Sequence, residues 1–74
     1  AEKTRPLKRE LETIDQRLAL LAQEKAQLEE RLMQQLPPAE IAECGRRLKT
    51  CTEEVERLEE KWLDVSATLE ELER

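Results

Sequence analysis

Side chains able to perform covalent or metal chemistry are scarce in this 74-residue chain. It contains two thiols, at Cys44 and Cys51, a single serine and no histidine. Nucleophilic catalysis requires a nucleophile beside a base, and structural zinc sites are built from about four Cys and His ligands. The sequence supplies neither combination. We therefore expect no catalytic residue, no metal site, no cofactor and no enzymatic activity within the chain itself.

The two thiols are seven residues apart, a spacing that places both on one face of a helix. The helix rise separates them by about 10.5 Å, which is too far for a disulfide within one chain. We interpret Cys44 and Cys51 as small buried hydrophobic side chains that stay reduced in a cytosolic environment.

Basic residues are the second group of candidate functional residues, because guanidinium and ammonium groups bind phosphates. They form two clusters, one near the start of the chain and one past its middle: Lys3, Arg5, Lys8 and Arg9, then Arg46, Arg47 and Lys49. The chain as a whole has 13 basic and 18 acidic residues, and this net charge of -5 disfavours a protein that grips a polyanion over its whole surface. The two clusters are the predicted nucleic-acid contacts, and solvated faces of a coiled coil are the alternative interpretation.

Apolar residues recur at alternating spacings of three and four, the pattern of a coiled-coil seam. In the first half of the chain they are Leu7, Leu11, Ile14, Leu18, Leu21, Leu28 and Leu32, with Lys25 in the one interrupted position. In the second half they are Ile41, Cys44, Leu48, Cys51, Val55, Leu58, Trp62, Val65, Leu69 and Leu72. Each half is therefore predicted to be one long helix that buries a narrow apolar stripe against the other half.

Two consecutive prolines, Pro37 and Pro38, separate the halves and cannot continue a helix. We predict a first helix over about residues 5–34, a turn over about 35–37 and a second helix over about 38–73. Pro38 suits the first position of the second helix and Glu40 its first turn, whereas Thr4 can cap the first helix. The expected fold class is all-α, a two-helix antiparallel coiled-coil hairpin that forms a single domain over residues 1–74.

The charges beside the two apolar stripes favour one register of this hairpin. A fold near residues 35–36 brings four oppositely charged pairs together across the seam: Arg31 with Glu40, Glu24 with Arg47, Arg17 with Glu54, and Glu10 with Lys61. A shift by one heptad would instead put Arg31 beside Arg47 and Arg17 beside Lys61. Exposed pairs contribute only about 0.3–0.5 kcal/mol each, so they select the register more than they stabilise the fold.

Individual helix positions carry further expectations. Lys25 is expected to set the register while its ammonium group reaches water, rather than to bind a ligand. Trp62 occupies a seam position and is expected to anchor the core, with base stacking as the alternative. Gly45 is expected to weaken the second helix by about 1 kcal/mol relative to alanine. For a closed seam, Leu18→Ala is expected to cost about 2–5 kcal/mol.

Several stretches of the chain resemble a known family. They are Pro6-Leu7-Lys8-Arg9-Glu10-Leu11-Glu12, the stretch Val55-Glu56-Arg57-Leu58-Glu59-Glu60-Lys61-Trp62-Leu63, and Leu69-Glu70-Glu71-Leu72. In this arrangement, around a short break, the chain resembles the C-terminal coiled-coil domain of ABC-F ATPases of the Uup and YheS type. The Glu-rich stretch into Trp62 and Leu63 is the most specific element, because tryptophan is uncommon in coiled coils. The compact turn at Pro37 and Pro38 departs from the longer, Tyr-containing connection of many relatives.

The resemblance implies a non-catalytic accessory domain of a soluble ATPase whose two cassettes bind ATP and Mg²⁺ in the parent protein. It also implies a cytoplasmic protein that acts on the ribosome or on DNA, so ribosomal RNA, DNA and the parent's own cassettes are the expected partners. No membrane contact is expected, because the longest apolar run covers residues 18–22 and roughly 20 residues are needed to cross a bilayer. The alternative function is a structural or protein-docking arm, and a monomer is expected over a four-helix dimer of open chains.

Overall fold

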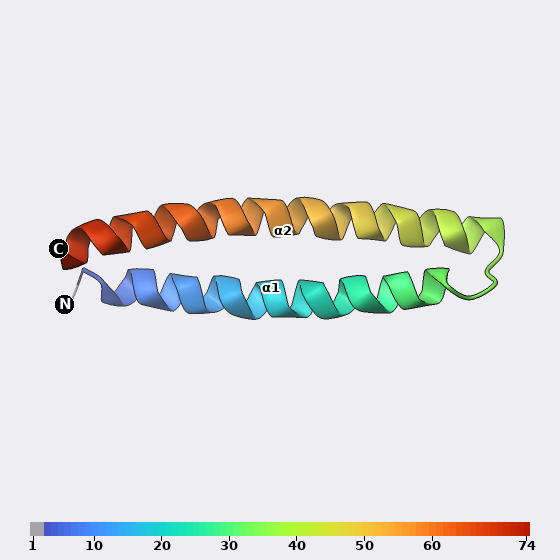
Figure 1. Cartoon of the computed structure of the whole chain (residues 1–74), viewed down its shortest axis with the longest axis horizontal. Coiled ribbons are helices and arrows are strands. Elements are labelled where there is room, and N and C mark those ends of the chain that lie inside the picture. Colours follow the sequence, from blue (N-terminus) through green and yellow to red (C-terminus); the bar gives the residue numbers. More distant parts are fainter. Residues whose placement is uncertain (1–2) are drawn as a thin grey trace.

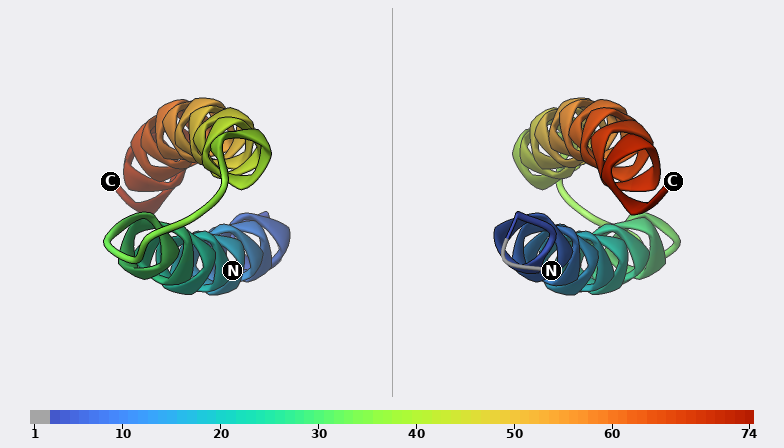
Figure 2. Two further views of the ribbon diagram at one scale, coloured as in Figure 1. Left: turned by 90° about the vertical axis from the view of Figure 1, so that its right-hand side faces the viewer. Right: turned by 90° about the vertical axis from the view of Figure 1, so that its left-hand side faces the viewer.

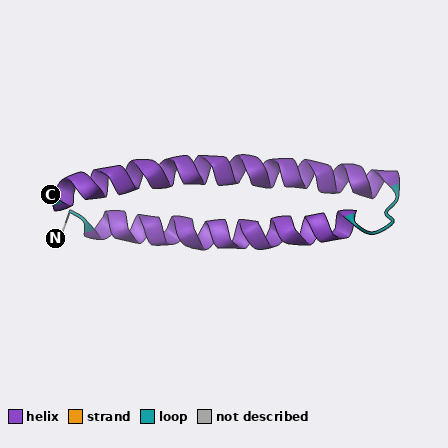
Figure 3. Cartoon of the chain, viewed as in Figure 1, coloured by secondary structure: helices purple, strands orange, loops and turns teal. Residues whose placement is uncertain are grey.

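The computed structural model describes residues 3–74, which form two antiparallel helices joined by a short turn (Figure 1). Helix α1 spans Arg5–Leu32 and helix α2 spans Pro38–Glu73. The hairpin extends 54 Å along its long axis and only 14 and 13 Å across it. Viewed from either end, the helices cross at a shallow angle, as in a coiled coil (Figure 2). The predicted all-α hairpin is therefore confirmed, and residues 3–74 contain no strand (Figure 3).

The turn between the helices is longer than the sequence predicted, because α1 ends at Leu32 rather than near residue 34. The N–H groups of Met33 and Gln34 donate to carbonyls three residues earlier, at 3.1 and 3.0 Å, which tightens and ends the helix. Leu36 then packs against the buried residues of the seam and fixes the path of the turn. The second helix begins at Pro38 as predicted, after Pro37 in an extended conformation with ψ of 151°.

The start of α1 differs from the predicted cap. The Thr4 side chain makes no N-capping hydrogen bond, because its backbone is already helical, with φ of −87° and ψ of −24°. An N-cap residue needs a more extended backbone to turn its side-chain oxygen toward the first free N–H groups. The Thr4 carbonyl instead accepts the N–H of Lys8 at 2.9 Å and so begins the helical ladder.

All four predicted ion pairs across the seam are present. Arg17 and Glu54 form a two-point contact, with nitrogen–oxygen distances of 3.0 and 3.3 Å. The pairs Arg47–Glu24, Lys61–Glu10 and Arg31–Glu40 lie at 3.0, 3.1 and 3.9 Å. The register is therefore the predicted one and not the register shifted by a heptad. Because these eight residues lie on one side of the seam, we call that side the paired flank.

The seam is buried unevenly. Six seam residues are buried. On each helix they are spaced by seven residues or a multiple of seven. We call them the buried row: Ile14, Leu21, Leu28, Cys44, Cys51 and Val65. The alternate seam positions, the half-exposed row, are only partly covered; they include Leu11, Leu18, Leu48, Val55 and Leu69. The pattern arises because each paired-flank residue lies three or four positions from the buried row, so its ion pair covers that row.

The structure corrects the expectation that Trp62 anchors the core. Trp62 belongs to the half-exposed row, and 36% of its surface is accessible. An indole ring is too large to be enclosed by two helices alone, because each helix covers only one narrow stripe of the other. Lys25, in the same kind of seam position on α1, is exposed as predicted.

We expect Gly45→Ala to raise the free energy of unfolding by about 0.5–1 kcal/mol, because glycine is a poor helix former. Gly45 lies inside α2, and a Cβ atom added there meets no atom within 4 Å. Urea denaturation followed by circular dichroism measures the change. The matched control is Ala42→Gly on the same exposed helix, which should lose a similar amount. A loss of stability in Gly45→Ala would contradict an unobstructed helical site.

Candidate nucleic-acid interface

The first predicted cluster, at the start of α1, presents most of its positive charge to solvent. Lys3, Arg5 and Arg9 are exposed, and none of the three has an ion pair within residues 3–74. Lys8 alone is engaged, through a loose contact of 3.7 Å between its Nζ and a carboxylate oxygen of Glu73. The sequence did not predict this contact, which arises because the hairpin returns the end of α2 to the start of α1.

The backbone adds to the positive character of this end. The first turn of α1 contains no acidic residue, so no side chain of that turn offsets the partial positive charge of its free N–H groups. Arg5 and Arg9 are one helical turn apart and therefore project from the same side. Basic residues at a helix N-terminus are electrostatically unfavourable, and an anion bound there would relieve the repulsion. We call Lys3, Arg5, Lys8 and Arg9 the basic end.

The second predicted cluster, near the turn, is largely neutralised. Arg46 donates a 2.7 Å hydrogen bond to Glu43 one turn earlier on α2. Arg47 donates a 3.0 Å hydrogen bond to Glu24 across the seam. Lys49 is exposed and has no ion pair among the described residues. The spacing of three between Glu43 and Arg46 is visible in the sequence and could have indicated this pair.

The ionisation of these groups follows from the same contacts. The hydrogen bond and the charge of Arg46 lower the pKa of the Glu43 carboxyl. The hydrogen bond to Glu24 and the charge of that carboxylate raise the pKa of Arg47. Both shifts favour the charged forms of Glu43 and Arg47, and the ion pairs themselves occupy the two arginines. A phosphate group would have to compete with carboxylates for Arg46 and Arg47, but not for Arg5 or Arg9.

The structure does not bring the two predicted clusters together. Lys3 to Arg9 lie at the end of the hairpin where α1 begins and α2 ends, and Arg46 to Lys49 lie toward the turn at the other end (Figure 1). The two clusters are therefore separate along the hairpin, and Arg46 and Arg47 of the second cluster are already held by carboxylates. The candidate interface is therefore reduced to the basic end, with Lys49 as an isolated cation.

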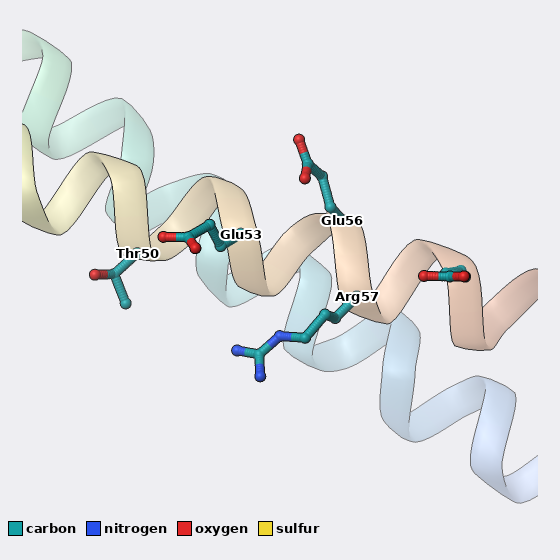
Figure 4. Close-up of a pocket in the computed structure, with 5 residues that line it drawn as sticks. Thr50, Glu53, Glu56 and Arg57 are labelled. Atoms are coloured by element: carbon teal, nitrogen blue, oxygen red, sulfur yellow. The ribbon is translucent and has the colours of Figure 1, made fainter.

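A surface hollow of about 410 Å³ runs along α2. Thr50, Glu53, Glu56, Arg57 and Glu60 line it, all from this one helix. Its labelled side chains spread apart, with Glu56 extending above the ribbon and Arg57 extending to the side (Figure 4). The hollow is thus the space between neighbouring side chains of one helix and does not converge on a ligand.

The two thiols lie apart from the basic residues, within the seam. Cys44 and Cys51 are buried and free, with 2% and 4% of their surfaces accessible, as the sequence predicted. Among residues 3–74 no group of three or more His, Cys, Asp or Glu side chains is placed to hold a metal ion. Neither described helix combines the length and apolar character needed to span a membrane.

The chain was compared with protein families, with curated proteins and with solved structures. A family model described as the ABC transporter C-terminal domain matches residues 3–67. No curated protein and no solved structure matches the chain. The matched residues cover all of α1, the turn and most of α2, so the similarity extends over the hairpin and is not confined to one heptad stretch. The chain therefore belongs to the ABC transporter C-terminal domain family.

Proposed function

We propose that this accessory domain of an ABC protein contacts nucleic acid through its basic end. The observation that carries the proposal is the difference between the two clusters of cations. Lys3, Arg5 and Arg9 are exposed and without ion pairs among residues 3–74, whereas Arg46 and Arg47 are held by carboxylates. Exposed cations at the positive end of a helix bind phosphate groups and carry little base specificity.

The proposed parent is a soluble ABC-F ATPase with two ATP-binding cassettes, in the cytoplasm. The family match and the resemblance around Trp62 and Leu63 support this parent. The proposed ligand is DNA or ribosomal RNA, both of which offer a regular array of phosphates. In the parent, ATP and Mg²⁺ would be bound by the cassettes and not by this hairpin. Two cassette sequences in the same reading frame upstream of the hairpin would support the assignment, and their absence would contradict it.

We expect Arg5→Gln with Arg9→Gln to weaken nucleic-acid binding by at least about tenfold at low salt. Fluorescence anisotropy with a branched DNA and with a structured RNA measures the affinity at several salt concentrations. The slope of log K against log [salt] should fall by about two, because two phosphate contacts are lost. The matched control is Arg46→Gln with Lys49→Gln, which removes the same charge near the turn and should change the affinity less than about twofold.

Two outcomes would contradict the proposal. If neither nucleic acid binds at low salt, the hairpin has no such function. If the variant near the turn loses the affinity and the variant at the basic end keeps it, the interface lies at Arg46 and Lys49.

A protein-docking arm is the second candidate function. The observation that favours it is the half-exposed apolar row, which lies on the side of the seam opposite the paired flank. The two candidate functions use different surfaces of the hairpin, so each can be removed without the other.

A further inference from the structure

A small groove opens on the side of the seam opposite the paired flank, and we call this side the open flank. The groove has a volume of about 250 Å³ and lies between the two helices. Asp15 and Leu18 line it from α1, and Glu59, Trp62 and Leu63 line it from α2. Leu63 is 63% exposed and Trp62 is 36% exposed, so the groove has an accessible apolar wall.

The position of the groove follows from the heptad geometry. Asp15 lies three residues before Leu18 and four after Leu11, so it borders the half-exposed row of α1. Glu59 lies four residues after Val55 and three before Trp62 and borders the corresponding row of α2. Short side chains such as Ala22, Thr52 and Ser66 occupy other positions of this flank and cannot cover the row. The open flank therefore exposes part of the seam along its length.

Around the groove, the charge of the open flank is uncompensated and acidic, whereas Lys8 and Glu73 pair with each other at one end of the same flank. Asp15 and Glu59 have no ion pair within residues 3–74, and the same holds for Glu12 and Glu56, one turn earlier on the respective helices. On the paired flank, by contrast, each carboxylate of the seam faces an arginine or lysine. Carboxylates that border an accessible apolar groove would be complemented by basic residues beside an apolar anchor.

The size and charge of the groove restrict its occupant. Small-molecule sites usually measure about 300–1,000 Å³ and enclose their ligand, so this shallower groove suits a side chain or two of a larger partner. A second copy of the chain would bring its own acidic flank and its net charge of -5 against the first, which is repulsive. Phosphate groups would be repelled in the same way, which separates this surface from the basic end.

We propose that the open flank docks a basic amphipathic helix of a partner protein. An apolar side chain of that helix enters the groove between Leu18, Trp62 and Leu63. Lysine or arginine residues one turn to either side pair with Asp15 and Glu59. The helix lies along the half-exposed row and completes a three-helix arrangement, a form of helix-in-groove recognition. This docking role goes beyond nucleic-acid contact and does not depend on it.

Trp62 is the only tryptophan in the chain, so its emission reports on the groove directly. The probe is a synthetic amphipathic helix of about three heptads, with leucine on one face, lysine on the other and no tryptophan. Its titration should shift the Trp62 emission to shorter wavelength and saturate, because burial removes water from the indole. The matched peptide with glutamate in place of lysine should give no shift.

Three variants locate the contact. Asp15→Lys with Glu59→Lys should weaken peptide binding by at least about tenfold, because the pairing charges are reversed. Leu63→Ala should weaken it by about fivefold through the lost apolar wall. The charge-matched control is Glu53→Lys with Glu60→Lys on the outer side of α2, which should change the affinity less than about threefold. Circular dichroism confirms the fold of each variant, and Asp15→Asn with Glu59→Gln replaces any lysine variant that unfolds.

The proposal is overturned by any of four results. The first two are that the peptide fails to shift the Trp62 emission, and that Leu63→Ala binds the peptide as tightly as the unaltered chain. The third is an equal loss of peptide affinity in Asp15→Lys with Glu59→Lys and in Glu53→Lys with Glu60→Lys, which would indicate attraction to the acidic surface in general. The fourth is a shift of the Trp62 emission with protein concentration in the absence of peptide, which would make a second copy of the chain the occupant of the groove. Loss of nucleic-acid binding at the basic end leaves every one of these readouts unchanged, so the two proposals fail separately.

Discussion

Leu21→Ala is expected to lower the free energy of unfolding by about 2–5 kcal/mol. Leu21 is 2% exposed and lies in the buried core with Leu28, Cys44 and Cys51. A two-helix seam cannot collapse around the cavity without moving a whole helix. Because small single-core chains rarely exceed about 3–5 kcal/mol of net stability, the variant should be largely unfolded at room temperature. Urea titration followed by the helical circular dichroism signal measures the loss.

The neighbouring leucine provides a control of the same chemistry. Leu20 is 57% exposed, so Leu20→Ala should cost less than about 1 kcal/mol, and Glu12→Gln less than about 0.5 kcal/mol. Leu18→Ala should fall between Leu20→Ala and Leu21→Ala, since Leu18 belongs to the half-exposed row. Equal losses from Leu20→Ala and Leu21→Ala would contradict the assigned seam.

The second large effect is expected in the reactivity of the thiols. Cys44 and Cys51 should react with an aromatic disulfide about 100- to 1,000-fold more slowly than in the urea-unfolded chain, because reaction requires the seam to open. Variants with Cys44→Ala or Cys51→Ala isolate each thiol, and absorbance of the released thiolate gives the rate. The two remaining thiols should react at similar rates, since one opening event exposes both. Reaction at the rate of the unfolded chain would contradict a closed seam.

One of the two thiols, Cys51, makes the stability of the fold depend on pH in the alkaline range. Burial raises the pKa of the Cys51 thiol, and the charge of Glu24 acts in the same direction. The folded state therefore favours the neutral thiol. This contribution is fully present below the ordinary thiol pKa and is lost as the pH rises through the raised value. Urea titrations from pH 8 upward should show a steeper loss of stability for the unaltered chain than for Cys51→Ala, and parallel curves would contradict this origin.

The candidate site was only partly predictable from the sequence. The sequence named seven candidate cations but, apart from Arg47, did not show which of them lie beside a carboxylate. The register predicted the pair of Arg47 with Glu24, but not the pair of Lys8 with Glu73 at the far end of the chain or the pair of Arg46 with Glu43. The pair of Lys8 with Glu73 exists only once the hairpin is closed. The groove at Trp62 was missed for the same reason, since its two walls come from different helices.

The sequence by itself determined the two helices, the turn at Pro37 and Pro38, and the register. Heptad spacing is a local property that fixes which residues face the seam. Only one register of the two helices places Arg17 beside the oppositely charged Glu54. Only the tertiary structure decided which seam positions are buried. A heptad pattern treats Leu21 and Trp62 as equivalent, yet the first lies under the paired flank and the second beside the open one. Burial depends on what the partner helix places over each position, and two helices can cover only one side of their seam completely.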